Sequence, residues 1–235
     1  MKTLLIKLVG PLQSYGNEAT FSRRTSYHYP SKSAVLGLIA AALGYRRDDS
    51  RIQELNQLQL AVRIDQPGRT MTDFQTVEYD QKHHKRSLSY RDYLQDAVFV
   101  AAVAGEDELV EAIHSALHHP KFQLYLGRRA NVPAGALQTK ILDSGNPLSA
   151  LKSYEWQAAK WYQRRNKSYN AEIIADADLV PDARFVTYVK DSIGSFDQAH
   201  RWHTHRAVTE THVKLVSKDY QDADTDHDAF EIFSK

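Results

Sequence analysis

The 235-residue sequence predicts an α+β fold in which two helices pack on one face of an antiparallel β-sheet. Three observations lead to this prediction. A segment that is apolar almost all the way round lies between good helix caps, an amphipathic helix follows near residue 110, and strand-like segments flank both helices. The resulting order, β-α-β-β-α-β, is that of a ferredoxin-like domain, and the open sheet face of RRM-like domains is a common surface for RNA.

The first strand and the first helix have clear end signals. Apolar residues alternate within a strand expected at 3–9, and a Gly-Pro pair ends it. Ser31 is a good N-cap residue and Gly44 supplies a left-handed C-cap, so a helix is expected at 32–43. Its apolar surface predicts burial in the core, and a bilayer-spanning helix would need roughly 20 residues.

Alternation and turn residues predict the later elements. Strands at 71–79 and 93–104 flank a polar, basic segment at 80–92, which indicates a hairpin with a long functional tip. An amphipathic helix at 106–117 has acidic residues in its first turn and histidines at its end, as the helix dipole favours. Residues 144–182 are expected to form an irregular insertion rich in basic and aromatic residues. The remaining predictions are a short helix at 49–57 and strands at 59–65, 136–142, 185–190 and 207–216.

Composition restricts the classes of function. The chain has no cysteine, which excludes disulfides, thiolate nucleophiles and thiolate metal sites. Its net charge is +1 and its pI is about 7.9, whereas a free-standing nucleic-acid-binding domain usually has a pI above about 9. The charge is uneven, because residues 82–91 carry four Lys or Arg and no acid, while 219–231 carry six acids and no base. Without a signal peptide or membrane segment, we expect one cytoplasmic domain covering 1–235.

Two stretches favour a surface for single-stranded nucleic acid. The loop at 17–30 interleaves Arg with Tyr, and Tyr stacks on bases while Arg pairs with phosphates. The N-terminus of the helix at 32–43 offers free N–H groups, a Lys and hydroxyls, which suit a phosphate. A solvated loop with packed tyrosines and a core helix with ordinary caps explain the same residues, so both interpretations stay open on residue chemistry alone.

Four segments closely resemble the CasD family, the CRISPR-associated RAMP proteins of the type I-E Cascade surveillance complex. They are L-V-G-P-L-Q-S-Y-G at 8–16, Y-P-S-K-S-A-V-L-G-L-I-A-A-A-L-G-Y-R-R-D-D at 29–49, Y-R-D-Y-L-Q-D-A at 90–97 and Y-L-G-R-R at 125–129. The match runs in chain order from residue 4 to about 130, and the second and fourth segments are the most specific.

The resemblance implies a single RAMP domain with a ferredoxin-like palm and a β-hairpin thumb at about 76–93. This thumb would grip the repeat-derived 5′ handle of CRISPR RNA (crRNA) in antiviral defence. The subunit would cap one end of the complex, beside the backbone subunit CasC and the large subunit CasA. It would be non-catalytic, since CasE is the processing nuclease of this subtype, and we expect no catalytic residue, metal ion or cofactor.

The resemblance also implies which residues bind RNA. In the thumb they are Lys82, His83, His84, Lys85, Arg86 and Arg91. In the palm they are Gln13, Ser14, Tyr15, Gly16, Arg23, Arg24, Tyr27, Ser31, Lys32, Ser33, Arg128 and Arg129.

The main alternative is a metal-independent endoribonuclease that cleaves the CRISPR repeat. Such a reaction needs a base for the 2′-OH, an acid for the leaving 5′-oxygen and a cation for the phosphorane. Groups of the required kinds are present, but no spacing in the sequence fixes their mutual geometry. The candidates are Tyr27, His28, Lys32, His83 and His84.

A metal site is a weaker alternative. His203 and His205 would share one face of a strand, with His212 further along, but no carboxylate or Cys stands at a typical ligand spacing. We therefore interpret them as surface histidines. The aspartates at 222–226 are similar to a calcium loop, yet His227 and Phe233 stand where that loop needs Gly and Glu, which excludes it.

Overall fold

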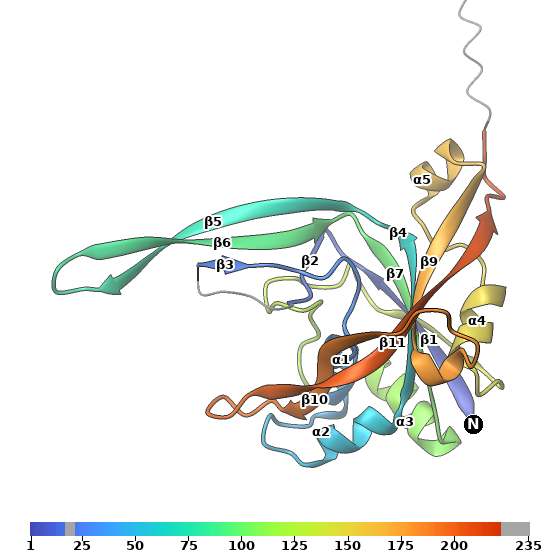
Figure 1. Cartoon of the computed structure of the whole chain (residues 1–235), viewed down its shortest axis with the longest axis horizontal. Coiled ribbons are helices and arrows are strands. Elements are labelled where there is room, and N and C mark those ends of the chain that lie inside the picture. Colours follow the sequence, from blue (N-terminus) through green and yellow to red (C-terminus); the bar gives the residue numbers. More distant parts are fainter. Residues whose placement is uncertain (17–21, 222–235) are drawn as a thin grey trace, which may run out of the picture.

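The computed structural model describes residues 1–16 and 22–221, which form two β-sheets with helices on both faces of the larger one. The larger sheet has seven strands, joined by antiparallel pairings. The smaller sheet contains a hairpin that projects from the body of the molecule (Figure 1). The predicted α+β architecture with antiparallel sheets is confirmed.

The larger sheet has the strand order β10-β11-β9-β4-β7-β1-β8. The first strand pairs along its whole length with β7, from Lys2 opposite Gly105 to Val9 opposite Val98. The bounds are β1 (Lys2–Val9), β4 (Gln59–Gln66), β7 (Val98–Gly105), β8 (Gln138–Leu142), β9 (Ser168–Asp176), β10 (Thr187–Ser195) and β11 (Trp202–Val216).

Helices cover both faces of this sheet. Leu4 of β1 joins the main core together with apolar residues of α1 and α3. Its neighbour Leu5, on the opposite face, packs with Leu148 and Leu151 of α4. Helix α4 therefore covers the centre of the second face. The prediction of an open RNA-binding face, made from the RRM-like pattern, was wrong there. The helices are α1 (Lys32–Leu43), α2 (Arg51–Glu54), α3 (Asp107–His118), α4 (Pro147–Ser153) and α5 (Lys160–Arg165), with 3-10 turns at Leu55–Gln57 and Ala177–Leu179.

Helix α1 begins and ends where its caps predict. The Ser31 side chain accepts a hydrogen bond from the backbone N–H of Ala34, and Gly44 adopts φ 82°, the left-handed conformation of a C-cap. Residues such as Leu36 and Ile39 are fully buried in the main core. Neither α1 nor another helix in the described ranges is long and apolar enough to cross a membrane.

The hairpin differs from its prediction in two ways. Its strands are β5 (Arg69–Asp80) and β6 (Lys85–Gln95), so most of the segment expected to be a long tip is paired strand. The predicted strand at 93–104 is also divided, because Asp96 has φ 56° and turns the chain between β6 and β7. Short strands β2 (Leu12–Gln13) and β3 (Arg23–Arg24) pair with the free edge of β6.

The segment at 144–182 is not irregular. It contributes α4, α5 and β9, and β9 pairs with both β4 and β11 inside the larger sheet. Arg63 of β4 contacts this segment: it is fully buried in an ion pair with Asp65 at 2.7 Å and donates to the carbonyl oxygens of Tyr154 and Glu155. The strand predicted at 207–216 is confirmed as part of β11, and residues 187–190 of the strand predicted at 185–190 belong to β10. The acidic segment reaching residue 231 lies largely outside the described residues.

Candidate nucleic-acid interface

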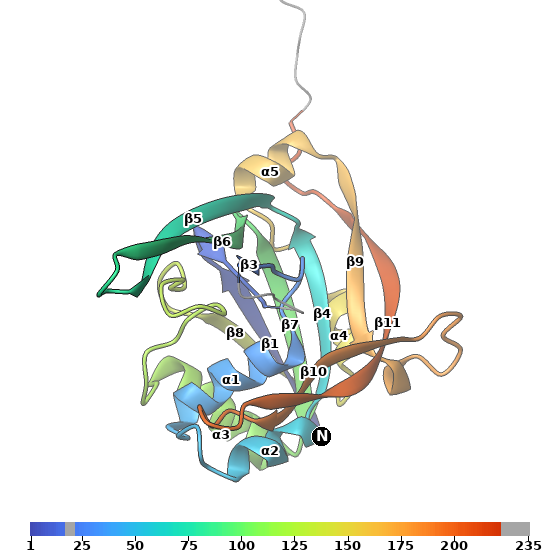
Figure 2. The ribbon, with the colours of Figure 1, turned by 60° about the vertical axis from the view of Figure 1, so that its left-hand side comes forward.

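The tip of the β5–β6 hairpin is basic and fully accessible. Its residues lie at the end of the projecting arm in Figures 1 and 2. His84 has φ 50° in the turn, and its Nδ1 lies 3.2 Å from a carboxylate oxygen of Glu78. Nδ1 of His83 lies 2.7 Å from a carboxylate oxygen of Asp80. Both rings are thus oriented by the hairpin itself. The exposed basic residues here are Lys82, His83, His84, Lys85 and Arg86.

One face of the hairpin carries exposed aromatic side chains that sequence reasoning missed. Phe74 is 63% exposed and stands directly opposite Tyr90, which is 41% exposed. Leu88 and Arg86 alternate with Tyr90 on the same face of β6. An aromatic pair that contributes little to a core is available for stacking on bases, and a cation follows along the same face. The signal was the alternation of Phe74 with polar neighbours.

Three arginines from distant segments meet at the root of the hairpin. β3 runs parallel to β6, so Arg24 is the register partner of Arg91. Arg128 donates to the carbonyl oxygen of Arg24 at 3.1 Å, and its guanidinium lies 4.6 Å from the ring centroid of Tyr93. The Nε of Arg91 and one Nη of Arg128 are buried without a hydrogen-bond partner among the described residues. On the other face of β6, Arg23 lies 3.6 Å from Asp92.

The loop that presents Arg128 is fixed against the segment after β1. Gly127 has φ 88°, and a Cβ there would lie 1.7 Å from the carbonyl oxygen of Ser14, so a side chain is excluded. The Ser14 N–H donates to Leu126 O at 3.2 Å, and its hydroxyl donates to Asp92 O at 2.9 Å. Arg129, next in the loop, is exposed.

The side chains of residues 13–15, which follow β1, are buried inside the fold. Gln13 is fully buried and donates to Ala97 O, and its other amide atom accepts from the hydroxyl of Tyr15 at 2.6 Å. Burial raises the pKa of Tyr15 far above its usual range. Gly16 is exposed, and the backbone N–H of Tyr27 donates to Tyr15 O at 2.7 Å. Of the residues expected to bind RNA in this segment, Gln13, Ser14 and Tyr15 are buried and Gly16 is exposed.

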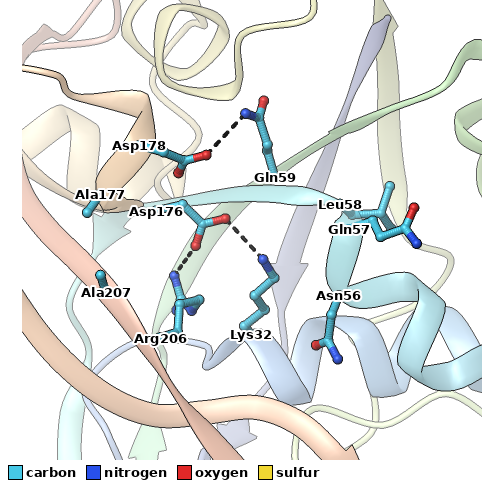
Figure 3. Close-up of a pocket in the computed structure, with 10 residues that line it drawn as sticks. All are labelled: Lys32, Asn56, Gln57, Leu58, Gln59, Asp176, Ala177, Asp178, Arg206 and Ala207. Carbon is cyan, nitrogen blue, oxygen red and sulfur yellow. Dashed lines mark hydrogen bonds and ion pairs between the residues drawn. The ribbon is translucent and has the colours of Figure 1, made fainter.

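The N-terminus of α1 already holds an anion from the chain itself. The backbone N–H of Lys32 donates to a carboxylate oxygen of Asp191 at 2.7 Å, and its Nζ lies 3.1 Å from Asp176. Arg206 contacts both carboxylates, as Figure 3 shows for Asp176. Ser31 is the buried N-cap, with its hydroxyl 3.3 Å from that of Ser33. A phosphate here would have to displace Asp191, so the geometry does not favour the expected phosphate site.

The structure separates the two hairpin histidines from the other nuclease candidates (Figure 1). Lys32 is buried in its ion pair with Asp176, whereas His83 and His84 lie in the turn that joins β5 to β6 in the projecting hairpin. His28, next to Tyr27 before α1, lies 3.4 Å from Glu172. This hydrogen bond raises the pKa of His28 and lowers that of Glu172.

The histidines considered as metal ligands are spread along β11. His203 is half-buried and His205 is exposed. Burial lowers the pKa of His203. In the described part of the chain, no group of three or more His, Asp or Glu is arranged to hold a metal ion. The aspartates at 222–226 lie outside the described residues.

Comparison with known proteins places these features in a family. The model of the family described as "CRISPR-associated protein (Cas_Cas5)" matches residues 3–224. The chain belongs to this family. Among curated proteins, this Cas5 family chain is 30% identical over 171 residues to the CRISPR system Cascade subunit CasD of Escherichia coli (strain K12), covering 65% of this chain and 76% of that protein.

Solved structures agree with this assignment. A chain of a "CRISPR RNA-guided surveillance complex" superimposes on the Cas5 family chain with a TM-score of 0.75 and 27% identity, covering 98% of both chains. A second structure, described as "Crystal structure of Cas protein", has a TM-score of 0.68 and 31% identity, covering 93% of this chain and 97% of the other. The similarity therefore includes the part beyond residue 130, where the sequence segments gave little guidance.

Proposed function

We propose that this chain is a non-catalytic subunit of a type I-E Cascade complex that binds the 5′ handle of crRNA in antiviral defence. The observation that carries the proposal is the projecting β5–β6 hairpin, which is basic at its tip and aromatic along one face, in a chain of the Cas5 family. Similarity to the Cascade subunit CasD and to a chain of an RNA-guided surveillance complex supports it.

In this proposal, the body of the molecule is the palm of the RAMP domain. Strands β4, β7, β1 and β8 are neighbours in that order, with α1 and α3 on one face, which is the arrangement of a ferredoxin-like domain. The thumb is then the whole hairpin of β5 and β6, longer than the 76–93 expected from sequence. We retain a single RAMP domain over 1–235 as part of the proposal.

RNA binding follows from the chemistry of two surfaces. The cations at the hairpin tip attract phosphates, and the pair of Phe74 and Tyr90 offers ring faces to unpaired bases. At the hairpin root, Arg91 and Arg128 are partly exposed, so their guanidinium groups can pair with a phosphate. Binding here fixes the handle as a scaffold. The neighbouring partners in this proposal are CasC and CasA, in the cytoplasm.

The test is to incubate the purified chain with end-labelled CRISPR-repeat RNA, with and without a chelator, and to score binding and cleavage on the same sample. We expect binding to the 5′-handle portion with the RNA intact. A variant with both His83 and His84 changed to Ala serves as the control for cleavage. Chelator-resistant cleavage that disappears in this variant would make the chain an endoribonuclease, and absence of binding would contradict the RNA-binding proposal.

A further inference from the structure

A second basic and aromatic surface lies on α5, which the handle-binding proposal does not use. None of the residues of α5 is buried, and Trp161 is 51% exposed. From residue 156 to residue 171 the chain carries four Lys or Arg and no acid. An exposed Trp on a helix that buries none of its residues offers part of its ring to a ligand.

A cavity of about 400 Å³ separates α5 from the root of the hairpin. Trp161, Tyr162 and Arg165 line it on one side, and residues 66–69 and 95–96 line it on the other. Its size falls within the range of about 300–1,000 Å³ that is usual for sites of small ligands. The first residue of β5, Arg69, belongs to this lining, so the cavity is continuous with the hairpin.

The aromatic wall of the cavity is held in place from behind. Tyr162 meets the ring of Trp161 edge-on at 5.6 Å, and it meets Trp156 edge-on at 5.9 Å. Trp156 is buried, stacks on Tyr169 at 5.8 Å and donates from Nε1 to Asp65 O at 2.8 Å. Through Tyr162, these ring contacts restrict the indole of Trp161 in the absence of a ligand. Less side-chain entropy is then lost on binding.

The charges around the indole suit a nucleotide. The guanidinium of Arg165 lies over the ring of Trp161, 5.7 Å from the ring centroid, so a cation already covers one face of the indole. Arg69 adds a second cation on the facing wall, and Asp96 is the acid of the lining. The lining therefore carries a net charge of +1, from two Arg and one Asp.

We propose that this cavity binds one nucleotide of single-stranded RNA. The base stacks on the face of Trp161 opposite to Arg165, and the phosphate pairs with Arg165 and Arg69. The inference rests on the proposed function, because it assumes that an RNA strand already lies along the adjacent hairpin. It adds a binding site to the segment at 144–182, which the hairpin and palm surfaces leave unused.

The experiment measures tryptophan fluorescence during titration with synthetic CRISPR-repeat RNA. The chain offers a matched pair, since Trp161 and Trp202 are each 51% exposed and Trp202 lies on β11. We expect RNA to quench the emission of Trp202→Phe, which keeps Trp161, and to leave the emission of Trp161→Phe nearly unchanged. Trp161→Ala should also bind RNA at least about fivefold more weakly, since one base loses its stacking partner.

A second matched pair tests the cation. Arg164 and Arg165 are neighbouring exposed residues of α5, but only Arg165 is among the cavity-lining residues. Arg165→Ala should reduce the quenching and Arg164→Ala should not, although both remove one charge.

Anisotropy of end-labelled RNA separates the two proposals. Tight binding with quenching that does not depend on Trp161 would overturn the nucleotide site alone, and absence of binding in all chains would overturn both proposals.

Discussion

Nζ of Lys32 lies 3.1 Å from a carboxylate oxygen of Asp176, and the side chains of both residues are less than one-tenth exposed. This ion pair joins the N-terminus of α1 to the end of β9. Asp176 also accepts from the backbone N–H of Leu60 at 2.8 Å and from Arg206. One carboxylate thus connects a helix with three strands, all close to the cavity shown in Figure 3.

Replacing Asp176 with Asn should destabilise the protein strongly. Lys32 and Arg206 would stay buried with one carboxylate, Asp191, between them, and an uncompensated buried charge costs about 3–5 kcal/mol. The measurement is the free energy of unfolding in urea. Asp178→Asn is the matched control, because Asp178 is exposed and should change stability by less than about 0.5 kcal/mol. Equal losses in the two variants would contradict this role for Asp176.

Local signals predicted α1 well, and long-range contacts decided what its N-terminus binds. The caps Ser31 and Gly44 act within a few residues, so the sequence pattern alone gives the bounds of the helix. The anion at its N-terminus comes from Asp191, which is 159 residues further along the chain. No local pattern indicates that a carboxylate of β10 would occupy the place proposed for a phosphate.

In the hairpin, too, local patterns were easier to predict than long-range pairing. Alternating residues predicted β5, but most of β6 was predicted to be a polar tip, so the register that places Phe74 opposite Tyr90 was not predicted. The break at Asp96 was also missed, because a positive φ at a non-glycine residue has no strong sequence signal. β9 was missed because polar residues interrupt its first half, and it is recognised as a strand only through its partners β4 and β11.

Charge reversal at the hairpin tip should weaken RNA binding and its dependence on salt. Lys85 and Arg86 are exposed at the start of β6, where they can neutralise phosphates. Changing both to Glu should flatten the slope of log K against log salt by about 0.7 for each lost contact to single-stranded RNA. The control is the same reversal at Arg46 and Arg47, an adjacent exposed pair after α1. If both double variants changed the slope equally, the effect would reflect net charge and not the hairpin.

Removing the aromatic pair of the hairpin should weaken RNA binding without changing the salt slope. Phe74→Ala combined with Tyr90→Ala deletes stacking surfaces but no charge, and each stacked base contributes roughly 1–3 kcal/mol. The control is Phe185→Ala with Tyr188→Ala, since these residues are 83% and 71% exposed beside and on β10. Affinities are measured by anisotropy at several salt concentrations. An equal loss in the control would show that the hairpin aromatics have no special role.

The pair of His28 and Glu172 should make stability depend on pH. Their hydrogen bond raises the pKa of His28 above its ordinary value of about 6.5 and lowers that of Glu172 below about 4.3. The contribution of His28 is complete below its unfolded pKa and is lost as pH rises through its raised folded pKa. The contribution of Glu172 is complete above its unfolded pKa and is lost as pH falls through its lowered folded pKa.

The pair therefore stabilises the fold most at about pH 5.5, between the two ordinary pKa values. We expect His28→Asn to lower the urea midpoint more at about pH 5.5 than at about pH 8. Glu210 also raises the pKa of His28, and His212 also lowers that of Glu172. The comparison is therefore the effect of His28→Asn in the Glu172→Gln variant. In that background His28→Asn should lose most of its pH dependence, because only the weaker influence of Glu210 is left. If His28→Asn kept its full pH dependence there, a partner other than Glu172 would be responsible.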